Sequence, residues 1–409
     1  MSLFVNLALR NIFRNRGRTY FALLSIAAGC SALILNGGIV FNIFGELRED
    51  AIHSRHGHLQ IYRRGYSEAH LEDPQRYLME PQTVQHILDV VRANPRVLRA
   101  TSRREFSGLI VKGDRYIPFL GVGVEPDQDA EFSRHTTLRA GSAMSASDPY
   151  GVMAGLGLAR KLDGKPGDEL TLMTVTASGA LNAVHVRLQG IFEGGLKEYD
   201  DWTLKVPLGA AGHLLSDNRI EQIVLLVRHT EDVPVVRSEF ESVFQRESSD
   251  VEMRSWDQLA LFHNQVVGLF GRELSIIRLI IGTIVLLGIS NVMGMSIMER
   301  MVELATLRAL GLRVRAIVAL LMIESLFIGL MGAAIGSTLG IAVARVVSAV
   351  GIPYPSPPGS TRPFLGGVDV VPDIVTAAFL ISVLATLAAA VLPIRKAIRS
   401  PIAPTLRCG

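Results

Sequence analysis

Four long, nearly uncharged segments constrain this chain more than any other feature of its sequence. They cover residues 19–41, 279–297, 316–343 and 372–394. A helix needs about 20 predominantly apolar residues to cross the roughly 30 Å hydrocarbon core of a bilayer. Buried helices of soluble proteins are shorter and keep a polar face. The four segments therefore predict four membrane-spanning helices.

The composition agrees with a membrane protein and excludes several other classes. Of the 409 residues, 49% are apolar and 19% are charged, whereas soluble domains usually carry about 25% charged residues. The mean hydropathy of +0.32 also excludes a disordered chain, and the net charge of +3 is too small for a nucleic-acid binder. Two cysteines, Cys30 and Cys408, cannot build a disulfide framework or a four-thiolate zinc site. The first apolar segment is longer than the about 7–15 residues of a signal-peptide core, so we expect a retained anchor.

The basic residues predict how the chain is oriented, because Lys and Arg gather in cytoplasmic segments near the ends of spans. Three segments carry four basic residues each: Arg10, Arg14, Arg16 and Arg18 before span one; Arg300, Arg308, Arg313 and Arg315 between spans two and three; and Arg395, Lys396, Arg399 and Arg407 after span four. The loop between spans three and four carries only Arg345 and Arg362. We therefore expect both termini in the cytoplasm and residues 42–278 on the other side of the membrane.

Residues 42–278 have the patterns of a folded α+β domain. Alternation of apolar and polar residues predicts strands, and apolar positions three and four apart predict helices. The strands are expected at 58–63, 106–112, 117–124, 169–175, 183–191 and 222–228, and the helices at 81–92, 155–162, 207–215 and 232–244. From Trp256 a helix is expected to run without a break into span two. Residues 126–219 are expected to form an inserted subdomain.

The complete predicted layout has nine parts. They are a cytoplasmic amphipathic helix at 1–18, span one at 19–41, the extracytoplasmic domain at 42–278, span two at 279–297, a cytoplasmic loop at 298–315, span three at 316–343, an outer loop at 344–371, span four at 372–394 and a cytoplasmic tail at 395–409.

The sequence contains no phosphate-binding loop. Such a loop needs G-x-x-x-x-G-K-[ST], but Gly164-Lys165 is followed by Pro166, and Ala159 stands where the first glycine is required. No G-x-S-x-G or H-E-x-x-H motif is present either. We therefore expect no catalytic residue and no cofactor site in this chain.

Three histidines, His53, His56 and His58, are close enough in sequence to suggest a zinc site. No neighbouring acid or thiol supplies an evident fourth ligand, and the stretch runs into a predicted strand on which His56 and His58 share a face. We favour a polar strand entry and expect no metal.

The segment 298–315 predicts a short amphipathic helix between two spans. Glu299 and Glu303 stand at its start and Arg308 near its end, which suits the helix dipole. Gly311 lies where a C-terminal cap is expected. Such a helix could lie on the lipid surface or dock into a cytoplasmic partner.

Span three contains two features that need protein neighbours. Gly332, Gly336 and Gly340 form a G-x-x-x-G-x-x-x-G face, and small residues of this kind let helices approach closely in a membrane. Glu324 is costly in lipid and must face protein or water. We favour a structural hydrogen-bond partner for Glu324, and a proton relay is the alternative.

Three stretches of the sequence resemble one known family. They are MGMSIMERMVELATLRALG at 293–311, which continues into a span containing IES, LALRNIFRNRGRT at 7–19 and PIRKAIRSPIAPTLR at 393–407. They are similar to the MacB/FtsX-like permeases of ABC transporters. One span, a large extracytoplasmic domain and three further spans is also that family's layout. The resemblance covers the whole chain and is weakest in the outer domain.

The resemblance implies that the short helix is the family's coupling helix, which sits on the ATPase. The residues that carry this match are Glu299, Arg300, Glu303, Leu307, Arg308 and Gly311. It also implies two copies of a separate ABC ATPase, which would hold ATP and Mg, and a second permease, either another copy or a paralogue. The chain would then be a non-enzymatic subunit of a bacterial inner-membrane transporter.

An unfused chain of this length is more similar to lipoprotein-releasing (LolC/LolE-type) permeases than to MacB-type exporters, which usually carry a fused ATPase. The run GHLQIYRRGY at 57–66 also resembles that branch. It implies a lipoprotein or lipid substrate and a periplasmic lipoprotein carrier. MacB-like efflux with a periplasmic adaptor, and FtsX-like control of a cell-wall hydrolase, stay open as alternatives.

Aliphatic residues on the first two spans are candidates for the lining of a substrate cavity. Ile26, Leu33 and Val40 lie seven residues apart and hence near one face of span one, and span two adds Ile284 and Leu287. Such a cavity would suit alkyl chains, because each buried methylene contributes about 0.8 kcal/mol.

Overall fold

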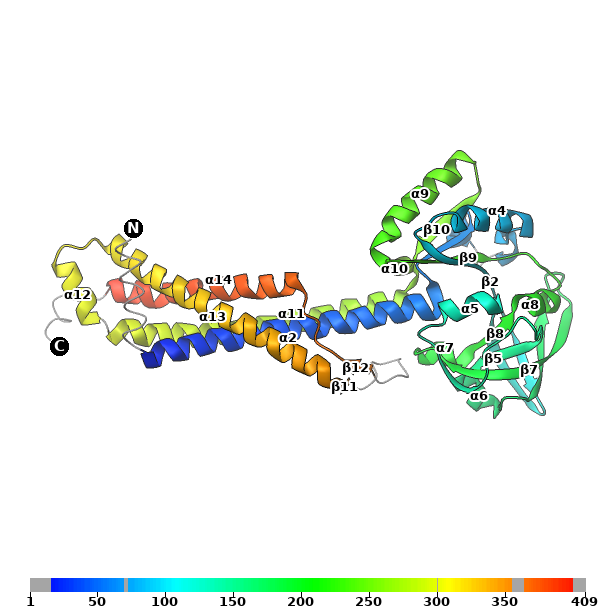
Figure 1. Cartoon of the computed structure of the whole chain (residues 1–409), viewed down its shortest axis with the longest axis horizontal. Coiled ribbons are helices and arrows are strands. Elements are labelled where there is room, and N and C mark those ends of the chain that lie inside the picture. The colour runs from blue at the N-terminus through cyan, green and yellow to red at the C-terminus, as the bar shows by residue number, and fades with distance from the viewer. Residues whose placement is uncertain (1–15, 70–72, 300, 355–363, 400–409) are drawn as a thin grey trace. The chain divides into compact units, whose positions relative to one another are not determined.

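A computed structural model describes residues 16–69, 73–299, 301–354 and 364–399. The chain divides into two compact units (Figure 1). The membrane unit comprises Met1–Gly45, Val267–Tyr354 and Leu365–Gly409, and the outer unit comprises Glu46–Val266 and Pro355–Phe364. The predicted helix at 1–18 and most of the tail lie outside the described residues.

Within the described residues, four helices are long and apolar enough to cross a membrane, which confirms the four predicted spans. They are α2 (Arg16–Ala51), α11 (Leu261–Glu299), α13 (Val314–Val350) and α14 (Pro372–Arg399) (Figure 1). Each helix continues beyond its apolar run. At 1.5 Å per residue, the 36 residues of α2 extend about 54 Å. The short helix α12 (Met301–Ala309) connects α11 with α13.

The outer unit is built on one sheet of ten strands, in the order β10-β1-β9-β2-β3-β8-β5-β7-β4, with β6 pairing to β2 and β7. The strands are β1 (Leu59–Arg63), β2 (Val97–Lys112), β3 (Arg115–Val124), β4 (Thr137–Gly141), β5 (Gly151–Gly155), β6 (Glu169–Val175), β7 (Leu181–Glu193), β8 (Thr203–Pro207), β9 (Gln222–Val227) and β10 (Val251–Ser255). The helices are α3 (Tyr66–Ala69), α4 (Pro81–Arg92), α5 (Pro126–Phe132), α6 (Leu156–Leu162), α7 (Lys197–Trp202), α8 (Leu208–Leu215), α9 (Val233–Arg246) and α10 (Trp256–Leu259). A sheet with helices in this order is an α+β domain, as predicted.

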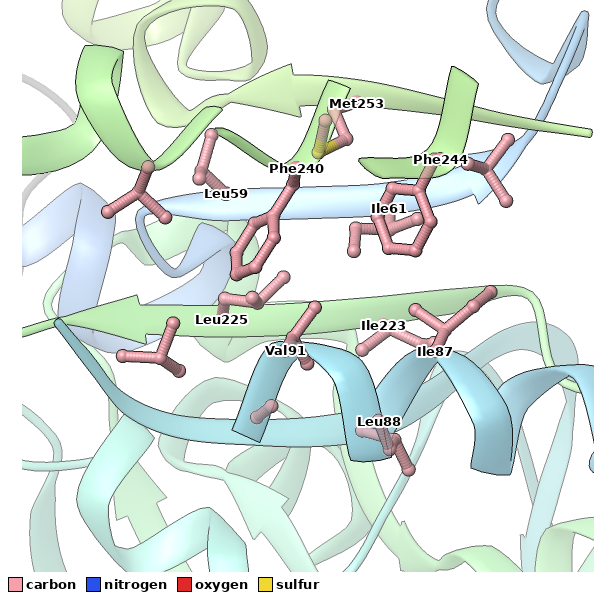
Figure 2. Close-up of a cluster of buried hydrophobic side chains, with 14 of the residues drawn as sticks. Leu59, Ile61, Ile87, Leu88, Val91, Ile223, Leu225, Phe240, Phe244 and Met253 are labelled. Atoms are coloured by element: carbon pink, nitrogen blue, oxygen red, sulfur yellow. The ribbon is translucent and has the colours of Figure 1, made fainter. Parts of the chain in front are cut away.

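Lobe one of the outer unit consists of β10, β1, β9 and the first half of β2, with α4 and α9. The amphipathic helices α4 and α9 bury their apolar stripes on one face of these strands. Figure 2 shows Val91 of α4 and Phe240 of α9 directed toward Leu59 and Leu225 of the sheet. The alternate residues of β9, Val224 and Leu226, pack on the other face. Both faces of β9 are therefore buried.

Lobe two consists of the second half of β2 together with β3 to β8, α6 and α8, around a second apolar core. Strand β2 belongs to both lobes. Residues Val97–Arg103 pair with β9, and Arg104–Lys112 pair with β3. Lobe two therefore begins within β2, before the boundary at 126 that the sequence suggests.

Two further expectations about the outer unit are wrong. The helix from Trp256 is not continuous with span two, because α10 ends at Leu259 and Ala260 leaves the helical conformation. His56 and His58 do not share a strand face, because residues Ile52–His56 form a single π-helical turn and β1 begins only at Leu59, after His58.

Candidate functional site

The short helix predicted between spans two and three is α12, and its C-terminal end has a defined geometry. The Leu310 N–H donates to the Thr306 carbonyl at 3.0 Å, and the Gly311 N–H donates to the Arg308 carbonyl at 3.0 Å. Gly311 has φ +93°, a conformation that a residue without Cβ adopts at little cost. Arg313 then occupies the N-cap position of α13, where its carbonyl accepts from the Ala316 N–H at 2.8 Å. The glycine ends α12 as the sequence predicts.

Helix α12 has one face in the core of the membrane unit and one face exposed. Leu304 and Ala305 are each 6% exposed and pack in the same cluster as Ile317 and Ile394. The Arg308 guanidinium donates to the Ile398 carbonyl at 3.2 Å and links α12 to the end of α14. These contacts fix the orientation of α12 in the membrane unit.

The exposed face of α12 carries apolar side chains beside an acidic one. Val302 is 42% exposed, and Leu310, just beyond the helix, is 79% exposed. Glu303 is exposed on the same helix. Three other residues of the predicted coupling set are not placed in full: Arg300 and the side chains of Glu299 and Leu307 lie outside the described residues. The exposed face is therefore defined by Val302, Glu303 and Leu310, and we call it the α12 face.

The glycine stripe of span three lies against span one. A Cβ added to Gly336 would lie 2.7 Å from the Ala27 carbonyl oxygen, and one added to Gly332 would lie 2.8 Å from Ile26 Cβ. Gly340 approaches Ile34 in the same way. Because real side chains would not fit at these distances, the glycines allow α13 and α2 to touch. Glu324 is also buried, within the same unit.

The five cavity candidates are not equivalent in the structure. Ile26 is fully buried against Gly332, so here it is a packing residue and does not line open space. Leu33 is partly buried in a small cluster, and Val40 is 8% exposed. Ile284 and Leu287 of α11 are 65% and 61% exposed. Only the α11 pair is accessible in the single chain.

The outer unit contains a buried charge cluster that the sequence did not suggest. Lys205 of β8 donates to Asp129 Oδ2 at 2.7 Å and to Ser133 Oγ at 2.6 Å. The Arg103 guanidinium lies 3.5 Å from the other oxygen of Asp129. Burial by itself would raise the pKa of Asp129, but Lys205 and Arg103 outweigh burial and hold it below its usual range. No sequence signal joins these residues, because each comes from a different element.

The histidines of the predicted strand entry pack as aromatic rings. The His53 ring stacks on that of His135 with centroids 5.2 Å apart. It is perpendicular to the His58 ring, with centroids 5.9 Å apart. A hydrogen bond with Asp50 raises the pKa of His135. Among the residues that the structure describes, no group of three or more His, Cys, Asp or Glu could hold a metal ion.

Two protein-family models match this chain, one over its N-terminal half and one over its C-terminal region. Residues 19–243 match the MacB-like periplasmic core domain, and residues 275–402 match the FtsX-like permease C-terminal domain. The chain belongs to the MacB/FtsX-like family of ABC transporter permeases. This permease is a multi-pass membrane protein with an α+β domain between its first and second spans.

The curated relatives of the permease cover several branches of the family. An uncharacterized ABC transporter permease of Methanocaldococcus jannaschii is 28% identical over 52% of this chain and 53% of its own length. The macrolide export ATP-binding/permease protein MacB of Bdellovibrio bacteriovorus is 24% identical over 42% and 28%. The lipoprotein-releasing system transmembrane protein LolC of Neisseria meningitidis is 24% identical over 49% and 50%. The matches thus span about half or less of these relatives.

Two solved structures similar to the permease are of isolated outer domains. The periplasmic region of MacB from Actinobacillus actinomycetemcomitans is 12% identical, with a TM-score of 0.37 over 53% of this chain and 95% of that one. The extracellular domain of the Gram-positive transporter YknZ is 10% identical, with a TM-score of 0.36 over 48% and 99%.

Proposed function

We propose that this permease transmits ATP-driven movement from a separate ABC ATPase, which docks on the α12 face, to the outer unit. The observation that supports it is a short helix held by the core on one side, with Val302, Glu303 and Leu310 exposed on the other. Two ATPase copies would hold ATP and Mg, and this chain would bind neither. Leu304 and Ala305 anchor α12 in the core of the membrane unit, so α12 cannot rotate independently of that unit.

The test is a matched pair of substitutions in the full chain, co-expressed with its ATPase. Val302→Asp places a charge on the α12 face, and Val235→Asp places the same charge at a similarly exposed site, 45% against 42%, on α9 of the outer unit. We expect Val302→Asp to weaken copurification of the ATPase at least tenfold, because a buried unpaired charge costs several kcal/mol. Val235→Asp should retain it. Equal retention by both variants would exclude the α12 face as the docking site.

We further propose that the permease works as a pair, either two copies or one copy and a paralogue. The exposed apolar length of α11 supports this, because only 6% of its most apolar stretch is buried in the single chain. A cysteine at Ile284 should crosslink to a second permease in membranes, and a cysteine at the buried Ile328 of α13 should not. Crosslinking from neither position would argue against pairing through α11.

The substrate we propose is an acyl-chain amphiphile, namely a lipoprotein extracted from the membrane with a periplasmic carrier. Two observations support this class: the exposed aliphatic residues Ile284 and Leu287 on α11, and the similarity to a relative named as a lipoprotein-releasing protein. Photocrosslinkers at positions 284 and 287 should capture lipidated protein in cells, whereas one at the buried Ile26 should not. Capture of a soluble drug, with drug sensitivity on gene deletion, would favour efflux with an adaptor.

We place the permease in the bacterial inner membrane with both termini cytoplasmic. Ser54 is unsuitable for cysteine labelling because it is 4% exposed, but Ala146 is exposed in the outer unit and Arg313 is exposed at the start of α13. In a Cys408→Ser background, an impermeant reagent should label Ala146→Cys in spheroplasts and leave Arg313→Cys unlabelled. The opposite pattern would invert the topology.

A further inference from the structure

A cavity of about 220 Å³ lies in the outer unit, between α5 and one face of the sheet of lobe two. Met153 of β5 and Phe192 of β7 line it, whereas the neighbouring Val152 and Ile191 belong to the apolar core of the lobe. Because successive side chains of a strand point to opposite faces, the cavity lies on the face opposite that core. The residues that α5 and its C-cap contribute are three and four apart: Pro126, Asp129, Ala130 and Ser133. One face of α5 therefore forms the other wall.

The inner end of the cavity is charged. Among the described residues that line it, Lys205 is the one basic side chain and Asp129 the one acidic side chain, and they are 3% and 6% exposed. The Lys205 ammonium has three N–H groups, and its acceptors within the described part of the chain are Asp129 and Ser133. The ring centroid of Phe192 lies 5.2 Å from Nζ. A ligand oxygen would be a stronger acceptor for the third N–H than this ring.

The buried cluster that includes Lys205 carries an excess of positive charge. Arg103 lies 3.5 Å from Asp129, so two buried cations share one carboxylate. Burial lowers the pKa of Lys205 even though Asp129 raises it, and hence this one carboxylate does not compensate for the loss of water around the ammonium. A second carboxylate beside Lys205 would balance the three groups, because buried charges are only weakly screened by solvent.

The walls between this cluster and solvent are apolar. Met144, Met153 and Phe192 line the inner part, and Leu138, which is 45% exposed, and Ala143 line the mouth. Methionine side chains adapt to irregular ligands. An apolar cavity of about 150 Å³ holds a benzene molecule, so at the same density this one holds roughly nine non-hydrogen atoms. An inorganic anion would leave the walls uncovered, and a hydrocarbon would offer no acceptor to Lys205.

We propose that this cavity binds a short monocarboxylate with an unbranched apolar chain, whose carboxylate accepts from Lys205 and whose chain lies against Met144 and Leu138. The ligand meets both requirements of the site, the missing negative charge at its inner end and the apolar walls. The site goes beyond the proposed function, because it lies in the outer unit and takes a free carboxylate. It is separate from the α12 face and from the exposed residues of α11.

The first test compares three ligands of one chain length on the full chain in phosphatidylcholine nanodiscs. Isothermal titration calorimetry at neutral pH would use hexanoate, hexan-1-ol and hexylamine, and partition into the bilayer adds only a signal that does not saturate. Hexanoate should bind saturably and at least tenfold more tightly than hexan-1-ol, since a hydrogen bond between charged groups is much stronger than one to a hydroxyl. Equal binding of hexanoate and hexan-1-ol, tighter binding of hexylamine, or no saturable binding of hexanoate would overturn the proposal.

The second test removes the buried pair with little change of shape. Asp129→Asn/Lys205→Met should lose the preference for hexanoate over hexan-1-ol. The matched control is Lys112→Met/Asp168→Asn, which removes another Lys–Asp pair of lobe two, at 2.6 Å, that does not line the cavity. This control should keep the preference. An unchanged preference in Asp129→Asn/Lys205→Met would overturn the role of Lys205.

The third test blocks the mouth and leaves the buried cluster intact, so it decides the proposal even if the pair variant fails to fold. Ala143→Phe should weaken hexanoate binding at least tenfold. Ala146→Phe, at an exposed position of the same segment that does not line the cavity, should bind as wild type does. A ligand that binds only the folded state stabilises it, so hexanoate should raise the urea midpoint of wild type and Ala146→Phe but not that of Ala143→Phe. Normal hexanoate binding by Ala143→Phe would overturn the proposal.

Discussion

The outer unit and the membrane unit bury their residues to very different extents within the single chain. In the outer unit, two apolar cores fill both lobes, and even charged side chains such as Asp129 and Lys205 find partners inside. In the membrane unit, α13 has half of its most apolar stretch buried, but α11 has only 6%. The outer unit therefore completes its own packing, whereas the membrane unit leaves surface for lipid or other subunits. Substitutions that affect either the folding of the chain or its association with lipid and other subunits test this contrast.

The largest effect is expected where α13 touches α2. Gly336→Leu would put a Cβ 2.7 Å from Cys30 Cβ and from a backbone oxygen, so the two helices must separate. We expect most of the full chain to be lost as monodisperse protein in size-exclusion chromatography, because overpacking costs about 1–3 kcal/mol or more. Gly282→Leu on α11, which has no atom within 4 Å of its added Cβ, should behave as wild type. Similar recovery of both variants would contradict the contrast between the two helices.

The next effect is expected in the buried charge cluster. Asp129→Asn leaves Lys205 and Arg103 without their counter-charge, and breaking a buried pair costs about 3–5 kcal/mol. Asp148→Asn removes one partner of an ion pair in which Arg187 is 60% exposed, and should cost at most about 1 kcal/mol. Both tryptophans, Trp202 and Trp256, lie in the outer unit, so their fluorescence during urea unfolding reports the stability of this unit. Equal midpoints for the two variants would show that the cluster is not a buried pair.

A pH-dependent effect is expected at Glu221. Burial, and then the charge of Glu105, raises the pKa of Glu221 to about 7. Between the unfolded value near 4.5 and the folded value, the folded chain holds a proton that the unfolded chain has released. Stability therefore falls as pH rises through this window, by at most about 3 kcal/mol.

Glu221→Gln should remove that loss. The free energy of unfolding of the variant minus that of wild type should increase between pH 5 and pH 8, as measured by tryptophan fluorescence in urea. Taking the difference cancels the contribution of the histidines, which titrate in both proteins. A difference that stays constant across this range would mean that Glu221 is charged in the folded state throughout.

The smallest effect is expected on the exposed face of α11. Leu287→Ala changes a side chain that is 61% exposed, and should shift the melting temperature of the isolated chain by no more than a degree or so, since surface changes usually stay within about 0.5 kcal/mol. Ile328→Ala on α13, which is 5% exposed, should lower it by several degrees. If Leu287→Ala destabilised the purified chain as strongly, α11 would pack within the chain after all.

The sequence predicts an element well when its pattern is periodic. Helix α4 has the predicted bounds, because its apolar positions face one core and Pro81 starts it. Strands β5 and β8 are missed because all five residues of each are buried, so neither shows alternation. Strand β8 contains Lys205, which argues against burial until Asp129 is placed beside it. Ala260 gives no sign of the helix break that it makes.

In the candidate site, too, some features follow from neighbouring residues in the sequence, and others depend on residues far away in it. The existence of α12, its charges and its glycine end are local properties, and they follow from 298–315 alone. Which face of α12 is free depends on contacts with residues such as Ile317 and Ile394, and no local pattern contains them. The approach of α11 to α14 likewise depends on residues about 100 positions apart, Gly294 and Pro393.

Two features set the order in which the outer unit can fold during synthesis. Strand β2 belongs to both lobes, and the strands that pair with β1 come much later in the sequence. Lobe two can close once β8 and α8, which ends at Leu215, have been made. Lobe one cannot, because among the described residues the partners of β1 at Leu59–Arg63 are β9 and β10, which end at Val227 and Ser255. Strand β1 must therefore wait unpaired while residues 64–221 are added, and closing so long a loop is slow. An unpaired strand edge is prone to misassembly, so β1 is the part of the outer unit at which the nascent chain is at risk for longest.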